Sequence, residues 1–173
     1  MNIDFKILEK TKDDFGSVML FLNTIAHEKF GCDAPPPTDF FVVAKDKDNI
    51  VGCIGSSFAS LGMLHIEGLY NWNINEDRRT DYCEIGRWIA KEKDISLLLL
   101  KELIEFLIQK GIKFALCELR SGPARLAQQL GLPLKLTSGK LNIDLVPKEG
   151  RLYYEGEEPK LYKFDIRNIE WKY

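Results

Sequence analysis

The chain has 173 residues, of which 45% are hydrophobic and 29% charged, and its formal net charge is −2. These values are ordinary for a globular protein, and we expect residues 1–173 to form a single domain. No basic excess is present to replace counterions, so composition argues against a nucleic-acid partner. Charges near the N-terminus and short apolar runs argue against an exported or membrane-inserted chain, and we expect a cytoplasmic protein.

The few potential metal ligands are widely spaced. The chain has four cysteines, at positions 32, 53, 83 and 117, and two histidines. The sequence contains no Cys-x-x-Cys motif. His65 and Glu67 are two residues apart, but no third residue that could complete a metal site with them is evident. We therefore expect reduced, buried thiols and no metal site.

The N-terminal half predicts a strand, a helix and then a group of strands. Residues 2–9 alternate apolar and polar side chains, which indicates a half-buried strand, and helical spacing follows as far as Gly31. Strand-like runs at 40–44 and 50–58 flank a polar turn and predict an antiparallel hairpin. A third strand is expected around residues 63–70.

The C-terminal half predicts a crossover. Residues 82–90 and 113–119 have the composition of strands, and between them residues 96–110 form a mostly buried helix with one polar stripe. Such a strand–helix–strand unit makes the two strands parallel. A short helix at 123–132 and two tail strands, at 134–145 and 160–166, complete an α/β (α+β) mixed sheet with helices on both faces.

The strand YCEIGRWIA contains a glutamate and an arginine three residues apart. In a regular strand Glu84 and Arg87 would point to opposite faces. Placing a carboxylate and a guanidinium at this spacing, on either side of a glycine, therefore requires an explanation.

Several stretches resemble one superfamily when taken in their order along the chain. EIGRWIA, the helix SLLLLKELIEFLIQKGI, the strand KFALCEL and the helix ARLAQQLGLP resemble GNAT-type N-acyltransferases, and among them the acyl-homoserine-lactone (autoinducer) synthases and N-acyl amino acid synthases. MLHIEGLY and GRLYYEGEEPKLY resemble the thermostable haemolysins of the same superfamily, whose Tyr-Tyr…Pro tail is matched by Tyr153, Tyr154 and Pro159. The resemblance covers roughly residues 40–165.

This resemblance implies a GNAT-like fold, with a central mixed sheet in which a parallel strand pair is splayed at a β-bulge and opens a cleft. A bulge slips the alternation by one residue, so Glu84 and Arg87 would share a face, and Gly86 is suited to host it. The pair is then either an architectural salt bridge or part of the substrate cleft.

Two positions depart from the family's pattern. Gly55 stands where lactone synthases carry an arginine, which puts a homoserine-type acceptor in doubt. No glycine lies between residues 86 and 111, so the glycine-rich turn that cradles a pyrophosphate is missing. Lys91 and Lys93 remain to meet phosphate, opposed by two acidic neighbours. A donor presented on an acyl carrier protein would depend less on phosphate binding by this turn.

The resemblance implies an acyltransferase that moves an acyl group from a thioester donor, acyl-CoA or the acyl-phosphopantetheine of an acyl carrier protein, to the amine of a small molecule such as an amino acid. Backbone amides of the splayed strand would hold the oxyanion. The residues expected to act fall into three sets: catalytic Glu84, Arg87 and Tyr154; donor-binding Ile89, Ala90, Lys91, Lys93, Arg120 and Arg125; and acceptor-binding His65 and Glu67.

The alternative is a catalytically silent GNAT-like domain that binds or scaffolds. Simpler interpretations of single residues also stay open: Arg120 and Arg125 as solvated surface charges, and the two tyrosines as an aromatic lid. Cys83 and Cys117 border the expected cleft, but no basic residue that could activate either thiol is evident, so we interpret them as buried core side chains. Membrane lysis, suggested only by the haemolysin name, lacks an amphipathic cationic segment. The sequence leaves the oligomeric state undetermined.

Overall fold

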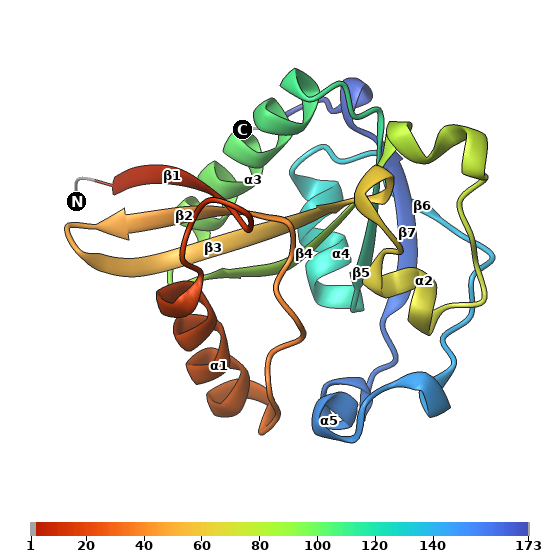
Figure 1. Cartoon of the computed structure of the whole chain (residues 1–173), viewed down its shortest axis with the longest axis horizontal. Coiled ribbons are helices and arrows are strands. Elements are labelled where there is room, and N and C mark those ends of the chain that lie inside the picture. The colour runs from red at the N-terminus through yellow and green to blue at the C-terminus, as the bar shows by residue number, and fades with distance from the viewer. Residues whose placement is uncertain (1–2, 173) are drawn as a thin grey trace.

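The computed structural model describes residues 3–172 and contains one seven-stranded sheet with strand order β1-β2-β3-β4-β5-β7-β6 (Figure 1). Strands β4 and β5 are parallel, and every other neighbouring pair is antiparallel. The strands are β1 (Ile3–Glu9), β2 (Phe40–Asp46), β3 (Asn49–Phe58), β4 (Tyr82–Ala90), β5 (Phe114–Leu119), β6 (Lys135–Leu136) and β7 (Lys160–Asp165).

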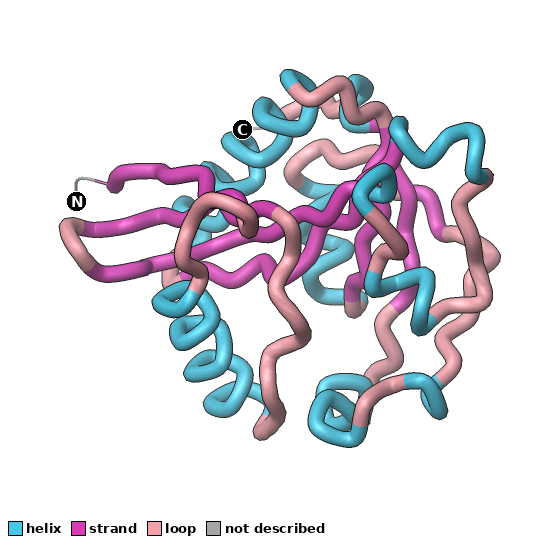
Figure 2. Tube along the Cα trace, viewed as in Figure 1, coloured by secondary structure: helices cyan, strands magenta, loops and turns pink. Residues whose placement is uncertain are grey.

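Helices pack on both sides of this sheet, which runs through the middle of the molecule as the magenta trace in Figure 2. They are α1 (Gly16–Phe30), α2 (His65–Leu69), α3 (Lys93–Gln109), α4 (Ser121–Gln129) and α5 (Arg151–Tyr154). One face buries the apolar side chains of α3 and α4 in a common cluster, while α1 and α2 belong to two separate clusters on other strand residues. The mixed sheet with helices on both faces is therefore confirmed.

The best-predicted elements are those with a strong pattern and a clear stop. The hairpin of β2 and β3, the crossover β4–α3–β5 and the helix α4 all lie where the sequence placed them, with ends shifted by a few residues. Gly31 ends α1 in the left-handed region, with φ of 67°, which suits a glycine after a helix. The parallel pairing of β4 and β5 follows from the crossover.

Two predicted strands are wrong. Residues 63–70 contain the helix α2, because the Glu67 carboxylate accepts hydrogen bonds from the backbone N–H of Leu64 and from Arg79, which fixes a helical turn in place of an extended chain. Of residues 134–145 only β6 is a strand. Beyond it the Asn142 side chain accepts from the backbone N–H of Asp144 and starts a 3-10 turn.

The parallel pair separates halfway along. Strands β4 and β5 are paired from Tyr82 opposite Phe114 to Ile85 opposite Cys117. Beyond that point β4 continues beside β3, and β5 continues beside β7. The splay that the family resemblance implied is present, and it leaves the ends of both strands bordering a gap.

A β-bulge accompanies the splay. Gly55 of β3 lies opposite Gly86 of β4, whereas Cys53 lies opposite Ile89, so one residue of β3 faces two of β4. The predicted bulge is confirmed, but Gly86 does not carry its unusual backbone. Arg87 does, with φ of 53°, in the left-handed region that few residues other than glycine adopt.

No helix among residues 3–172 is long and apolar enough to cross a bilayer. Within the same part of the chain, no group of three or more histidine, cysteine, aspartate and glutamate side chains gathers as a potential metal site.

Candidate active site

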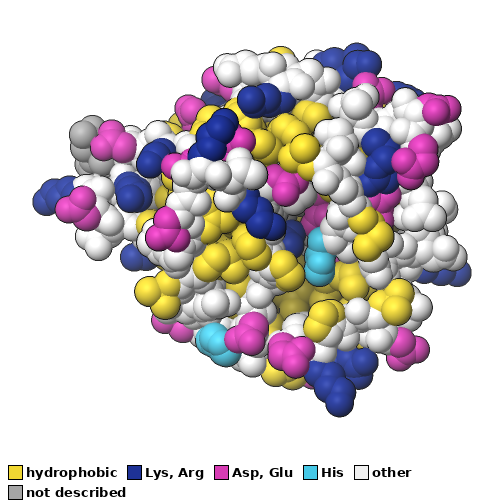
Figure 3. All heavy atoms as spheres, in the orientation of Figure 1, with side chains coloured by type: hydrophobic (Ala, Val, Ile, Leu, Met, Phe, Trp, Pro, Cys, Tyr) yellow, Lys and Arg dark blue, Asp and Glu magenta, His cyan; other side chains and the backbone are white. Residues whose placement is uncertain are grey.

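A cavity of about 710 Å³ lies where β4 and β5 part, and it has walls on both faces of the sheet. Helices α3 and α4 contribute Leu100 and Ala127 from one face, and α1 contributes Ala26 and Phe30 from the other. The walls are mostly apolar, and Figure 3 shows hydrophobic side chains around a hollow in this side of the molecule. The cavity therefore passes through the gap in the sheet.

The Glu84–Arg87 pair forms part of the cavity wall. Arg87 donates from Nη1 to Glu84 Oε1 at 2.9 Å, and both side chains are nearly inaccessible, with 5% and 4% of their surfaces exposed. Arg87 also donates from Nε and Nη2 to the carbonyl of Pro36, and the backbone N–H of Ile66 donates to Glu84 Oε2 at 3.1 Å. Both charged groups are thus held in fixed orientations. The two side chains share one face, as the bulge hypothesis requires.

Glu118, which sequence reasoning missed, faces the same cavity from β5. Burial raises the pKa of its carboxyl to about 7, and the nearby Glu84 charge pushes it in the same direction, against the hydrogen bonds from two tyrosines. The Tyr154 hydroxyl donates to both carboxylate oxygens at 3.2 Å. A carboxyl that titrates near neutral pH is suited to exchange protons with a substrate.

Strand register is the signal that could have found Glu118. Glu84 lies opposite Leu116 in the parallel pair, so Glu118, two residues further along β5, shares the face of Glu84. Parallel pairing followed by divergence puts the two carboxylates on the two sides of one gap. The alternation along each strand indicates which of its residues share a face, but the register between the two strands cannot be read from the sequence.

His65 also lines the cavity, at the start of α2. Burial lowers the pKa of its imidazole, the positive charge of Arg87 lowers it further, and Glu84 opposes the change. The ring is therefore predominantly neutral near pH 7 and can accept a proton or a hydrogen bond.

Glu67, expected beside His65 on a strand, is placed differently. Its two carboxylate oxygens each lie 2.9 Å from a guanidinium nitrogen of Arg79, and the side chain is 4% exposed. The carboxylate also accepts from the backbone N–H groups of Leu64 and Ile74. Glu67 holds α2 and the following loop together and does not line the cavity.

The donor-binding residues expected from the sequence divide into two groups. Ile89, Ala90 and Arg120 line the cavity. The charged side chains of Lys91, Lys93 and Arg125 do not: all three are exposed, and none reaches the cavity wall.

One backbone amide of β4 points into the gap. The N–H of Lys91 donates to the Val51 carbonyl of β3 at 2.9 Å. Because amides alternate along a strand, the N–H of Ala90 points away from β3, toward the side from which β5 has departed. It is the amide best placed to meet a substrate oxygen, whereas the N–H of Ile89 faces β3.

The strand cysteines beside the gap are not reactive thiolates. Burial raises the pKa of Cys83 to about 12 and that of Cys117 further. Both thiols are therefore protonated at neutral pH, which agrees with their interpretation as core side chains.

Solved structures of similar fold include several acyltransferases. The structure of TofI in a ternary complex with an inhibitor and MTA matches with a TM-score of 0.70 and 13% identity, over 94% of this chain and 91% of that one. The structure of BjaI, a CoA-dependent acyl-homoserine lactone synthase, with SAM and isopentyl-CoA matches with a TM-score of 0.67 and 12% identity, over 96% and 84%. FeeM, an N-acyl amino acid synthase from uncultured soil microbes, matches with a TM-score of 0.58 and 9% identity, over 95% and 90%.

No protein-family model matches the chain, and no curated protein matches it in sequence. The solved structures establish the fold. They come from the groups that the motifs of this sequence resemble, and the predicted GNAT-like fold is confirmed.

Proposed function

We propose that the protein is an acyltransferase that moves an acyl group from a thioester donor to the amine of a small molecule. The observation that carries this proposal is the gap between β4 and β5, which opens into one cavity on both faces of the sheet. Such a gap lets a donor and an acceptor approach one carbonyl carbon from opposite sides. Glu84 and Glu118 face the gap from its two strands.

The cavity suits an acyl thioester as donor. Apolar walls from α3 and α4 would bury an acyl chain, and the N–H of Ala90 would stabilise the oxyanion that forms when an amine attacks the thioester carbonyl. The structure of BjaI, a CoA-dependent acyl-homoserine lactone synthase, contains isopentyl-CoA. In this chain no glycine-rich turn opens α3, so either acyl-CoA or an acyl carrier protein could present the thioester.

Glu118 is the proton acceptor in this proposal. The acceptor ammonium loses one proton to Glu118, and the neutral amine then attacks the thioester carbonyl and forms the C–N bond. As the C–S bond of the tetrahedral intermediate breaks, the nitrogen releases its second proton to solvent, which leaves a neutral amide. Tyr154, which is hydrogen-bonded to Glu118 and whose pKa is raised by burial, is protonated and would give its proton to the departing thiolate. The proton taken up by Glu118 then restores the hydroxyl. Glu84 and Arg87 orient the acceptor because their own hydrogen bonds hold them still.

The test is release of free thiol. The protein is incubated with acyl-CoA donors from acetyl to tetradecanoyl, with the same acyl groups on an acyl carrier protein, and with a library of amino acids and simple amines. We expect thiol release that depends on the acceptor and falls at least about a hundredfold in Glu118→Gln. Background release with every donor and acceptor would contradict catalysis.

A silent binding domain is the second candidate. The absence of a glycine between β4 and α3, together with the acidic residues Glu92 and Asp94 at the start of that helix, favours it. Thermal unfolding with coenzyme A shows whether the folded protein binds this molecule, because a ligand that binds only the folded state raises the unfolding midpoint. A raised midpoint without thiol release would favour the silent domain.

A further inference from the structure

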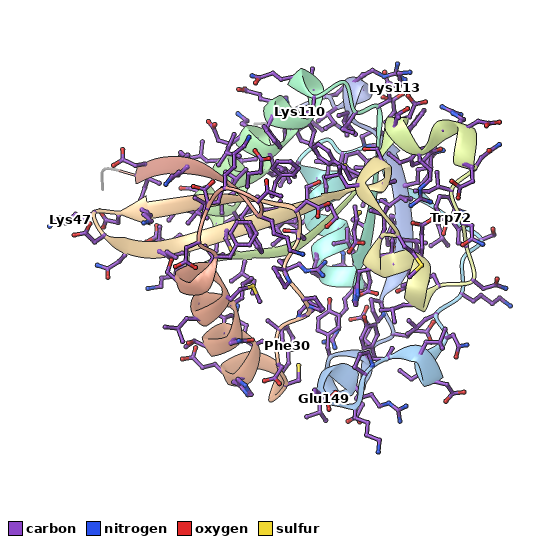
Figure 4. All side chains as sticks on the ribbon, viewed as in Figure 1. Phe30, Lys47, Trp72, Lys110, Lys113 and Glu149 are labelled. Carbon is purple, nitrogen blue, oxygen red and sulfur yellow. The ribbon has the colours of Figure 1, made fainter. Side chains whose placement is uncertain are left out.

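Arg120 follows β5 directly, as the residue before α4, and lines the cavity two residues beyond Glu118. Its guanidinium lies over two aromatic rings, 5.4 Å from the centre of Phe30 and 4.6 Å from that of Tyr153. The two rings contact each other edge to face at 5.2 Å, so α1 and the segment of α5 meet at this point. In Figure 4 Phe30 and Glu149, both cavity residues, lie at this edge of the molecule, where α1 approaches α5.

The guanidinium has cation–π contacts and acts electrostatically on the Glu157 carboxylate, but forms no ion pair with it. Its Nε–H is buried and has no hydrogen-bond partner, and no ion pair involves Arg120 within residues 3–172. The guanidinium of Arg87, by contrast, donates hydrogen bonds to the Glu84 carboxylate and to the Pro36 carbonyl. The neighbouring Glu157 carboxylate is also engaged, by the backbone N–H of Ser121 at 2.7 Å. A buried donor without an acceptor destabilises the protein unless a ligand supplies one.

We infer that Arg120 is a binding site for the carboxylate of the acyl acceptor, which would then be an amino acid or another amino-carboxylate. This inference rests on the proposed function. The aromatic rings hold the guanidinium in position at the cavity wall, and a guanidinium recognises a planar carboxylate through two parallel hydrogen bonds. Arg120 and Glu118 are about 7 Å apart along the chain, at the rise per residue of a strand. That spacing lets one small molecule place its amine at Glu118 and its carboxylate at Arg120.

Binding of two matched probes tests the inference without any turnover. N-decanoylglycine carries the carboxylate, and N-decanoylglycinamide replaces it with an uncharged group of the same shape. By isothermal titration we expect the intact protein to bind the acid at least about tenfold more tightly than the amide. Arg120→Gln should remove this preference and leave amide binding unchanged, and Arg120→Lys should keep part of it. Lys148→Gln, which removes one exposed positive charge that does not line the cavity, should keep all of it.

A second pair of probes separates an acceptor carboxylate from a donor phosphate. 4′-Phosphopantetheine and pantetheine differ only in the phosphate that a thioester donor carries. One contrary outcome is that Arg120→Gln weakens the binding of 4′-phosphopantetheine and leaves the binding of N-decanoylglycine unchanged. In that case Arg120 binds the phosphate of the donor, and the inference is overturned. Equal binding of acid and amide by the intact protein overturns it as well. A failure of catalysis alone changes neither result, because both measurements are of equilibrium binding.

Discussion

At the scale of single residues, the site depends on charges whose surroundings differ. Glu84 and Arg87 form a buried ion pair, and the backbone N–H of Ile66 also holds the Glu84 carboxylate in place. Glu118 faces the same gap with tyrosine hydroxyls as partners and a pKa raised to about 7 by burial. In the proposed mechanism the two carboxylates would have separate tasks, one to orient the acceptor and one to carry a proton, because their partners differ.

The pH dependence of Glu118 gives a first prediction. Its pKa is raised in the folded state from 4.5 to about 7, so the folded protein holds this proton more tightly than the unfolded chain. The associated stability is fully present below about pH 4.5 and is lost as pH rises through about 7. Relative to Glu118→Gln, the wild-type free energy of unfolding should therefore fall across that window. His65, with its lowered pKa, changes in the opposite sense and is common to both proteins.

Urea denaturation of both proteins at several pH values measures this difference, and thiol release gives the second readout. Activity should rise with pH as Glu118 loses its proton. Parallel stability curves for wild type and Glu118→Gln would show that the carboxyl titrates normally.

The backbone of Arg87 gives a second prediction. Arg87→Ala removes the partner of a buried carboxylate and should destabilise the protein by about 3–5 kcal/mol. Arg87→Gly removes the same ion pair but accepts φ of 53° without strain, so it should be less destabilising than the alanine variant by about 1 kcal/mol. Denaturant unfolding of the two variants measures the comparison. If the glycine variant is the less stable one, the left-handed conformation of Arg87 carries no strain.

At the scale of elements, the decisive feature is the part of the sheet where β3, β4 and β5 meet. Strand β4 pairs with β5 for four residues and then follows β3 alone past a bulge. The bulge sets which side chains of β4 face the cavity, and the divergence frees the amide of Ala90. Any change that straightens β4 should therefore alter several site residues together.

Gly55 gives a third prediction, at the bulge. A Cβ on Gly55 would lie 2.4 Å from Thr38 Oγ1 and 2.9 Å from Thr38 Cγ2, and Thr38 is buried. Gly55→Ala should therefore destabilise the protein by about 1–3 kcal/mol. Gly122, in the helix α4, has open space around it, so Gly122→Ala should be neutral or slightly stabilising. Differential scanning calorimetry measures both. A stable Gly55→Ala would mean that Thr38 moves aside easily.

At the scale of the whole molecule, the cavity links layers that are far apart in sequence. Side chains from α1, α2, α3, α4 and α5 meet around one gap in the sheet. A ligand there would contact both faces, which suits a reaction between two substrates. The shape of the cavity, not any single motif, then limits which acyl chains fit.

The cavity walls give a fourth prediction. Ala127, in α4, is fully buried and lines the cavity, so Ala127→Leu should fill part of it. If an acyl chain lies there, the preferred donor should become shorter, seen as a lower kcat/KM for decanoyl than for butanoyl donors. Gln129→Leu, at an exposed position of the same helix, is the control. An unchanged chain-length preference in Ala127→Leu would place the acyl chain elsewhere.

The local elements were determined by the sequence itself. Alternation and helical spacing located β1, the β2–β3 hairpin, β4, α3 and β5, because burial of one face imposes a period on each element. The bulge was predicted from the family resemblance, and it explains how a Glu and an Arg three apart on a strand share a face. The strand at 63–70 was predicted wrongly because a distant Arg79 stabilises the turn of Glu67.

The tertiary structure alone decided the cavity and its chemistry. Strand register placed Glu118 on the same face as Glu84, on the other side of the gap, and the meeting of α1 with α5 placed two rings against Arg120. A pKa depends on burial and on neighbours from other elements, which no short stretch of sequence contains. Local periodicity therefore predicted the helices and strands, whereas the raised pKa of Glu118 and the unpartnered Nε–H of Arg120 arise only where distant segments pack together.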